Sequence, residues 1–505
     1  MEVLSFFKKR NNYFLFLSIA VVLYGITAFK SDGFYQVDEH YQIIEFAQLK
    51  SGNIEPESLP WEFHEKMRPT LQPMIAYGVF SFLEAFGVDN PYTKALVLRL
   101  LTALLALVAI HRFVKVTETQ IQSNWGKRCY YFLAFFLYFL PYVNVRFSSE
   151  TWSGLFLLLG VSYVLRKDRN YYMLGVLLGV AFLFRFQISF AVLGLFLYLY
   201  FSRTSKLKDV LKALAGILIL VFVGIVLDSW FYGEFVVSQW NYVYQNVILG
   251  KAASFGVSPW YGYVFILYYA PLLATGIIVL FALLVKLRYE PKNMVLWIVV
   301  SSILIHSLVA RKDARFLFPL LNFVPILLMG AGQIVKHKLL PSWMKNKLLK
   351  FGTMTYLLMH FTLALGVSQY NRNEIVNNLT KNLYQNYHGR PIAIYYYGNV
   401  LPKNLFKVHP MPFYYDSSVH FKELTNLKDV AQVKTSAEVN TFIWFNEKDV
   451  AGKNLNHLEG YELVQESCPQ YIQQLYTWLR GKNRHVHNEV LYLKTNRESV
   501  RLHDQ

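Results

Sequence analysis

The sequence predicts an all-α protein that crosses a membrane many times and ends in a small α/β domain. Hydrophobic residues make up 54% of the 505 residues and charged residues only 16%, whereas a soluble domain usually carries about a quarter charged residues. Long apolar runs alternate with short basic segments, the pattern of membrane spans and their loops. This alternation stops after residue 370, so we expect a membrane region over 1–370 and a separate domain over 371–505.

About eleven spans are expected, because a hydrocarbon core of about 30 Å needs roughly 20 apolar residues in a helix. The expected spans are 13–29, 93–111, 130–147, 150–165, 171–184, 187–202, 213–230, 262–285, 294–310, 315–334 and 352–369. The run 71–87 is shorter and contains Pro73 and Glu84. We expect it to be re-entrant or interfacial, because the basic segments then all face one side.

Those basic segments are 8–10, 112–128, 166–169, 203–212, 286–292 and 336–350. Short Lys- and Arg-rich loops lie on the cytoplasmic side of a membrane, so we expect a cytoplasmic N-terminus and an extracytoplasmic C-terminal domain. The same loops account for the net charge of +18 without nucleic acid as a partner. Cys129 and Cys468 fall on opposite sides of the membrane, which excludes a disulfide between them within one chain.

The C-terminal domain is expected to mix strands with helices. Short apolar runs at 392–397, 441–445, 461–464 and 490–493 are typical of strands. The segments 372–384 and 470–479 have helical spacing instead. A domain of this length is large enough to bury a core of its own.

Two stretches of the first extracytoplasmic loop carry residues suited to chemistry. Asp38, Glu39 and His40 follow the first span directly, and a carboxylate there could take a proton from a hydroxyl group. The alternative is a solvated helix start, where acidic residues favour the helix dipole. The second stretch is 61–64, followed by Arg68. It is either part of a functional loop or an amphipathic helix lying on the membrane surface.

The expected extracytoplasmic face also carries cations against the usual charge rule. The turn 311–315 contains Arg311, Lys312 and Arg315. Positive charge on this side does not help to orient the protein in the membrane, so the three cations indicate an anionic ligand such as a phosphate. Arg185 lies at another tight turn and either snorkels or binds an anion. Arg99 and Arg146 share that ambiguity. We find no phosphate-binding loop, dinucleotide motif or zinc-ligand spacing, so no cofactor is expected and no metal ligands are assigned. The sequence leaves open whether the reaction requires a metal.

Three blocks of the sequence resemble glycosyltransferase family 22, the mannosyltransferases of the GT-C type that act in GPI-anchor and N-glycan assembly. The first block is Asp38-Glu39-His40-Tyr41-Gln42 with Glu45, Gly52, Trp61-Glu62-Phe63 and Arg68. The second is Asp228-Ser229-Trp230-Phe231-Tyr232-Gly233, Asn241-Tyr242, Asn246 and 256–261. The third is Lys312, Arg315-Phe316 and Pro319. The family usually has His-Pro before Asp-Glu, where this chain has Gln36-Val37, and His-Lys-Glu where it has 311–313.

The resemblance implies inverting transfer of a sugar from a polyprenyl-phosphate donor to a lipid-linked glycan or glycolipid acceptor. It nominates Asp38 as the base, with Glu39 as a second catalytic carboxylate. The candidates for binding the departing phosphate are Arg185, Lys312, Arg315 and His306. Candidates for substrate binding are His40, Trp61, Glu62, Arg68, Asn241, Trp260 and Tyr261, although membrane-belt positions are the commoner fate of Trp and Tyr. The divergence indicates a bacterial homologue in the inner membrane with a periplasmic site.

The rival reading is a transporter or flippase for a lipid-linked glycan, which would share the many spans and the outer cations. Transporters often show internal repeats and polar residues near the middle of the membrane. Here the centres of the expected spans are nearly uncharged and no repeat is visible. These features favour the enzyme.

Overall fold

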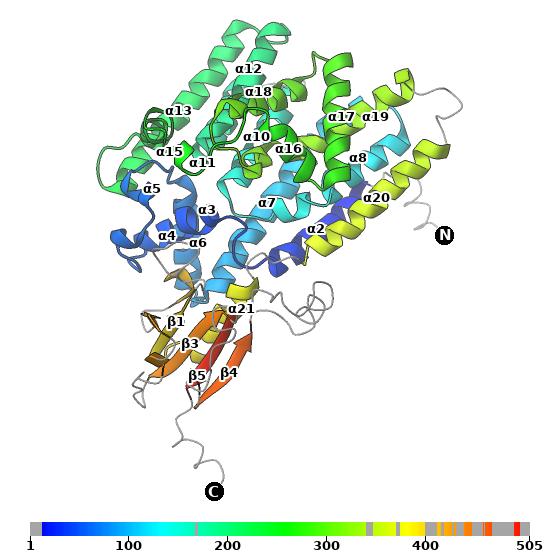
Figure 1. The fold of residues 1–505 in the computed structure, drawn as a ribbon. Coiled ribbons are helices and arrows are strands. Elements are labelled where there is room, and N and C mark those ends of the chain that lie inside the picture. The colour runs from blue at the N-terminus through cyan, green and yellow to red at the C-terminus, as the bar shows by residue number, and fades with distance from the viewer. Residues whose placement is uncertain are drawn as a thin grey trace.

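The computed structural model describes a helical body with a small sheet at one end (Figure 1). The described residues are 13–166, 170–339, 347–369, 374–398, 412–415, 419–426, 429–430, 439–446, 458, 460–466 and 489–494. The longer helices of the body are α2 (Tyr13–Lys30), α6 (Leu71–Ala85), α7 (Pro91–Thr117), α8 (Asn124–Phe136), α10 (Ser149–Val164), α11 (Tyr171–Phe184), α12 (Ser189–Phe201), α13 (Leu207–Tyr232), α17 (Leu273–Tyr289), α18 (Met294–Leu308), α19 (Val324–Ile334) and α20 (Lys347–Val367).

Short helices form the loops and turns between these. They are α3 (Val37–Glu39), η1 (His40–Ile44), α4 (Glu45–Lys50), η2 (Pro56–Ser58), α5 (Trp61–His64), η3 (Glu118–Gln120), α9 (Leu140–Val143), η4 (Phe186–Ile188), α14 (Ser238–Val243), η5 (Tyr244–Ile248), α15 (Lys251–Ser254), α16 (Gly262–Tyr269), η6 (Ala314–Phe323) and η7 (Val335–Leu339). Of these, α3 to α5 belong to the first loop, 30–92, and α14 to α15 to the second loop, 229–261. The expected spans and the charge rule predict that both long loops lie outside.

Four helical stretches of the described residues are long and apolar enough to cross a membrane: Tyr13–Lys30, Pro91–Gln120, Leu207–Tyr232 and Ala314–Leu339. Ala274–Tyr289 and Met294–Leu308 qualify together and meet at a bend of 119°. The chain is thus a multi-pass membrane protein, while the number of eleven spans stays a prediction. The doubtful run 71–87 is α6, which at 15 residues is shorter than a span and packs against α4 and α7.

Close helix packing in the body depends on small residues. A Cβ atom added at Gly175 would lie 2.1 Å from the carbonyl oxygen of Ala213, and one added at Gly179 would lie 2.6 Å from the Leu220 side chain. Gly216 on α13 meets the α11 backbone in the same way. The Gly-x-x-x-Gly spacing on α11 therefore lets α11 and α13 approach closely, as small residues do between membrane helices. This contact holds α11 in place, and α11 ends at Arg185.

The sheet consists of β1 (Ile392–Tyr397), β2 (Val419–Leu424), β3 (Asn440–Asn446), β4 (Tyr461–Glu466) and β5 (Glu489–Lys494), in the order β2-β1-β3-β5-β4. β1 pairs in parallel with β2 and β3, whereas β5 runs antiparallel to β3 and β4. All four predicted strands are present, and β2 was not predicted. The predicted helix at 372–384 is α21 (Glu374–Tyr387). The expected helix 470–479 and Cys468 lie outside the described residues.

Contacts with the first loop attach this C-terminal region to the body. The Lys381 ammonium lies 3.2 Å from an Asp32 carboxylate oxygen, and the hydroxyl groups of Tyr92 and Thr380 are 2.6 Å apart. A 3-10 turn, η9 (Pro412–Tyr414), places Phe413 in a buried aromatic cluster with Phe80. The sheet therefore lies beside the end of the body that contains α3, α4 and α6 (Figure 1).

Candidate active site

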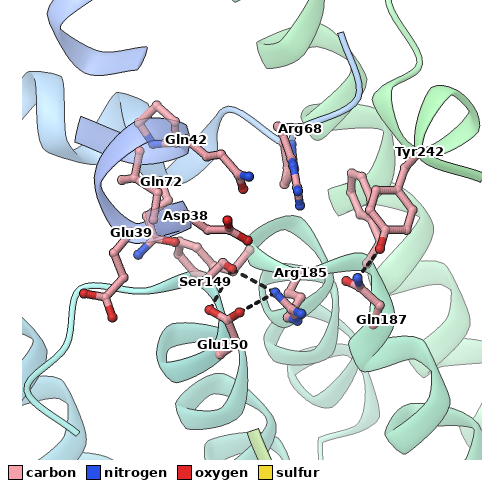
Figure 2. A pocket seen from close by; sticks show the side chains of 15 residues that line it. Asp38, Glu39, Gln42, Arg68, Gln72, Ser149, Glu150, Arg185, Gln187 and Tyr242 are labelled. Atoms are coloured by element: carbon pink, nitrogen blue, oxygen red, sulfur yellow. Dashed lines mark hydrogen bonds and ion pairs between the residues drawn. The ribbon is translucent and has the colours of Figure 1, made fainter. Parts of the chain in front are cut away.

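A narrow pocket gathers charged side chains from distant parts of the sequence (Figure 2). Its lining comes from α3, η1, the 68–69 loop, α6, the start of α10, the α11–η4 junction and α14. The polar members are Asp38, Glu39, Gln42, Arg68, Gln72, Ser149, Glu150, Arg185, Gln187 and Tyr242. The accessible volume is about 30 Å³, room for only two or three water molecules.

Asp38 is the carboxylate at the centre of this arrangement. It is the second residue of α3, which begins at Val37 directly after the extended residue Gln36. Its Oδ2 atom is 2.5 Å from Nη1 of Arg315, which belongs to η6. Figure 2 shows the Asp38 carboxylate directed toward the space between Arg68 and Arg185. Four segments that are far apart in sequence thus place one acid among three guanidinium groups.

The electrostatics of Asp38 follow from these neighbours. Burial alone would raise its pKa, but Arg315, Arg68 and Arg185 oppose burial, and the net effect places the pKa below the ordinary value of 3.8. Asp38 is therefore ionised at neutral pH. Such a carboxylate is a weak proton acceptor unless one of the neighbouring arginines binds another anion instead.

Glu39 faces a different part of the molecule. Its Oε2 atom accepts hydrogen bonds from Nε and Nη2 of Arg146, at 3.0 and 2.7 Å, and from the backbone N–H of Tyr35. The carboxylate is buried, and in Figure 2 it points away from Asp38. Arg146 also donates to the carbonyl oxygens of Ser31 and Gly33. Glu39 and Arg146 thus fix the chain just before α3.

His40 does not belong to the described lining of the pocket. Its Nε2 atom is 2.6 Å from Oε1 of Glu45, and both side chains are buried. The ring stacks on Tyr414 of the C-terminal region, with centroids 5.5 Å apart, and the Phe413 N–H lies 3.4 Å from the same Glu45 oxygen. His40 therefore connects the helix that carries Asp38 to the C-terminal region.

Arg68 is oriented by the loop residues around it. Glu62 Oε1 lies 3.4 Å from Arg68 Nη2 and also accepts a hydrogen bond from the Gln42 amide at 3.1 Å. The guanidinium lies over the ring of Tyr242, 5.9 Å from its centroid. Burial leaves Arg68 Nε without a hydrogen-bond partner. Arg68 is therefore held from the side while part of its fork stays available to an anion.

Arg185 lies where α11 breaks before η4, with an extended backbone. Its Nη1 atom donates to Glu150 Oε1 at 2.8 Å and to the Ser149 hydroxyl at 3.2 Å. Both partners belong to the first turn of α10, which Ser148 caps by accepting from the Thr151 N–H. The ring of Phe316 lies 5.3 Å from the guanidinium carbon. These contacts aim Arg185 into the pocket.

Lys312 and His306 lie near the pocket without lining it. The Lys312 ammonium donates to the carbonyl oxygens of Ser258 and Val309, at 3.0 and 2.7 Å, and burial lowers its pKa. His306 Nδ1 is 2.8 Å from the Ser302 carbonyl oxygen, while its Nε2 atom is buried without a hydrogen-bond partner. Of the four predicted phosphate ligands, Arg315 pairs with Asp38 and Arg185 lines the pocket, whereas Lys312 and His306 do neither.

The predicted aromatic and amide contacts are spread over the two loops. Trp61 stacks on Phe255 with Lys251 near its ring, and Asn241 donates to the Lys66 carbonyl oxygen. Trp260 and Tyr261 form an exposed edge-to-face pair. None of these four belongs to the described lining of the pocket, and their contact with substrate stays a prediction.

Several lining residues were not among the predicted site residues. They are Gln42, Gln72, Ser149, Glu150, Gln187 and Tyr242. Of these, Gln42 and Tyr242 belong to the blocks that carry the family resemblance. Glu150 carried a weak signal as an acid at the start of an apolar run, but helix dipoles explain acids at that position equally well. Gln187 donates to the Tyr242 hydroxyl, a pairing that joins the α11–η4 junction to the second loop. Among the described residues, no three His, Cys, Asp or Glu side chains form a metal-binding group.

Comparison with known proteins identifies the family and the fold of the chain. The model of the Alg9-like mannosyltransferase family matches residues 13–413. GPI mannosyltransferase 3 of Yarrowia lipolytica is 23% identical over 90% of this chain and 91% of its own. The human GPI alpha-1,2-mannosyltransferase 3 is 23% identical over 81% of this chain and 70% of its own.

Among solved structures, the fold matches ArnT from Cupriavidus metallidurans, which was crystallised with undecaprenyl phosphate bound. The TM-score is 0.57 at 13% identity, covering 96% of this chain and 98% of ArnT. The apo form of the same ArnT gives a TM-score of 0.55 at 14% identity, covering 95% of this chain and 97% of that one. At these identities the likeness shows a shared fold.

Proposed function

Because the chain belongs to the Alg9-like mannosyltransferase family, and is therefore a membrane glycosyltransferase of the GT-C type, we propose a specific donor, acceptor and base for its reaction. The donor is a polyprenyl-phosphate mannose, and the acceptor is a hydroxyl group of a lipid-linked glycan or glycolipid. Asp38 is the base. The observation that carries the proposal is the placement of Asp38 among Arg68, Arg185 and Arg315.

The reaction needs a base and an electrostatic partner for the leaving group. Asp38 takes the proton of the acceptor hydroxyl while the acceptor oxygen forms a bond to the anomeric carbon. The bond between that carbon and the donor phosphate breaks, and its electron pair leaves on the phosphate. Arginine forks match phosphate oxygens in a bidentate manner, so Arg185 and Arg315 stabilise the charge that develops there.

The pairing of Arg315 with Asp38 gives donor binding a second consequence. A phosphate that binds Arg315 competes with Asp38 for the same guanidinium, whose Nη1 atom is 2.5 Å from Asp38 Oδ2. Loss of that partner raises the pKa of Asp38 and makes the carboxylate a better base. Binding of the donor thus prepares the base for the acceptor.

The lipid donor is supported by the charge and position of the site. The pocket lining contains the guanidinium groups of Arg68 and Arg185, and Arg185 lies at the end of α11 beside the first turn of α10. With the predicted topology, a lipid phosphate at the membrane surface can reach this position. The ArnT that shares the fold was solved with undecaprenyl phosphate. The basic segments predicted to be cytoplasmic put this pocket on the extracytoplasmic face, which we include in the proposal.

The direct test is transfer of labelled mannose by the purified protein. We expect label from polyprenyl-phosphate mannose to appear in a lipid extract from the host membrane, and labelled GDP-mannose to give no product. Polyprenyl-phosphate glucose serves as the matched donor for sugar specificity. Transfer from GDP-mannose alone would contradict the lipid donor, and translocation of a lipid-linked glycan without sugar transfer would contradict the assigned reaction.

A further inference from the structure

An apolar groove with a basic mouth lies at the other end of the helices that build the pocket. Its lining residues come from α2, α7, α10 and α11, and its accessible volume is about 940 Å³. α10 connects the two sites, because Glu150 in its first turn lines the pocket while Ser162 and Tyr163 near its last turn line the groove. Twelve helical residues place them about 18 Å apart along the helix axis. The groove is therefore separate from the proposed active site.

The walls of the groove are apolar and open to the surroundings of the protein. Val21, Leu104, Val108 and Met173 line it, and all four side chains are exposed in the isolated chain. In a membrane, such a surface is covered by hydrocarbon. Hydrocarbon alone does not explain why one end of the groove is charged.

The mouth carries four basic residues: His111, Arg112, Lys115 and Arg166. Arg112 makes no hydrogen bond or ion pair within the part of the chain that the structure describes. Lys115 is one-third exposed, and its ammonium lies 3.6 Å from a Glu118 carboxylate oxygen. The described lining of the groove contains no Asp or Glu. The electrostatic potential at the mouth thus favours an anion next to an apolar channel.

We propose that this groove binds an anionic phospholipid. Its phosphate lies between Arg112 and Lys115, and an acyl chain follows Leu104 and Val108 along α7 toward the middle of the membrane. A zwitterionic lipid binds less well, because its own ammonium group meets the same cations. With the sidedness that the basic loops predict, the mouth lies in the cytoplasmic leaflet, where anionic lipids concentrate. This site is additional to mannosyl transfer and does not depend on it.

Native mass spectrometry of the purified full-length chain tests the proposal. We expect bound phosphatidylglycerol to survive detergent exchange in preference to phosphatidylcholine of the same acyl chains. The double variant Arg112→Gln/Lys115→Gln should lower phosphatidylglycerol retention about tenfold or more, since each cation near a membrane surface contributes severalfold to binding an anionic lipid. Arg288→Gln is the matched control, because Arg288 is a basic residue in the last turn of α17 outside the groove.

A second variant separates a lipid from a free phosphate. Leu104→Trp fills the apolar part of the groove and leaves every cation in place, and the exposed position of Leu104 spares the core. We expect it to lower phosphatidylglycerol retention, and millimolar inorganic phosphate to displace no lipid from the wild type. Equal retention of the two lipids by the wild type would overturn the proposal. So would full retention in the double variant, or equal losses in the double variant and Arg288→Gln.

Discussion

Nη1 of Arg315 lies 2.5 Å from Oδ2 of Asp38, so the proposed base and a proposed phosphate ligand form one ion pair. The two residues are far apart in sequence and meet because η6 turns back toward α3. This pair makes the two roles interdependent. Variants of either residue therefore report on both proton transfer and donor binding, and the experiments must separate these effects.

Asp38→Asn should abolish most transfer while leaving the protein folded. The amide keeps the size of the side chain but cannot take the acceptor proton, and loss of a general base typically costs about 10²–10⁴ in rate. The measurement is kcat for mannose transfer at matched protein levels, with donor binding assayed separately. Glu57→Gln, an exposed carboxylate in the same loop, is the matched control. A normal rate in Asp38→Asn would exclude Asp38 as the base.

The pH profile should respond to Arg315. In the wild type the pKa of Asp38 lies below 3.8, so kcat/KM, which reports the free enzyme, should stay flat as the pH falls to about 5. Arg315→Gln removes the cation that lowers this pKa most, while burial continues to raise it. The pKa of Asp38 then rises, and activity should fall at a higher pH than in the wild type.

Arg311→Gln is the control for this profile, because Arg311 belongs to the same turn but donates to the Phe255 carbonyl oxygen. Its profile should match that of the wild type. The contrary result is that Arg315→Gln lowers kcat/KM by the same factor at every pH, with no shift of the fall at acidic pH. That result would show that the ion pair does not set the pKa of Asp38.

Arg185→Ala should lower kcat by about 100-fold or more, the effect of removing one donor to a charge that develops in the transition state. Arg185→Lys should recover only part of the loss, because lysine lacks the bidentate fork. Glu150→Gln keeps Arg185 and leaves a hydrogen-bonding group 2.8 Å from the guanidinium. Its effect on kcat should therefore be far smaller than that of Arg185→Ala. Equal losses in Glu150→Gln and Arg185→Ala would indicate that the pair acts by holding α10 to α11.

The charged ends of apolar runs made part of the site predictable. Asp38 follows the first expected span and Arg185 ends an apolar run, and charge is costly at a membrane boundary without a partner. Arg68 was predicted from a charged aromatic stretch of the first loop instead. The cost of unpaired charge predicts that each of these charges has a partner or a role, whereas their meeting in one pocket is seen only in the structure. The choice between Asp38 and Glu39 does not follow from that cost either, because consecutive residues on a helix point in directions about 100° apart. Which one faces the pocket depends on Arg146, a distant residue.

Other parts of the site depend on geometry that local patterns do not reveal. His40 reaches Glu45 five residues on, across a π-helical turn, whereas ordinary helical spacing pairs residues three or four apart. Phe413 and Tyr414 enter the first loop from the C-terminal region, a contact that no periodicity indicates. β2 alternates imperfectly, with burial on few of its residues, so its sequence gave a weak strand signal.

The structure leads to a different prediction for Glu39 than for its neighbour. Glu39→Gln leaves the buried Arg146 without its carboxylate partner, and removing one member of a buried ion pair typically costs about 3–5 kcal/mol of stability. We expect a clear drop in the thermal unfolding midpoint in detergent. Transfer per folded molecule should fall much less than in Asp38→Asn. Unchanged stability with lost transfer would instead assign a catalytic role to Glu39.

Sidedness is the remaining prediction, because the proposal places donor, acceptor and base together outside the cytoplasm. Cysteine at Ser58 or Ser254 tests the two loops beside the pocket, and both positions are on short surface helices. Cysteine at Ser205, in the basic 203–212 segment, tests the opposite side. The background carries Cys468→Ser, while the buried Cys129 stays. An impermeant thiol reagent on intact cells should label the first two and spare the third until the cells are opened. The reverse pattern would put the pocket on the cytoplasmic side, so the donor would have to be presented from within the cell. The proposed anionic-lipid groove would then face the outer leaflet.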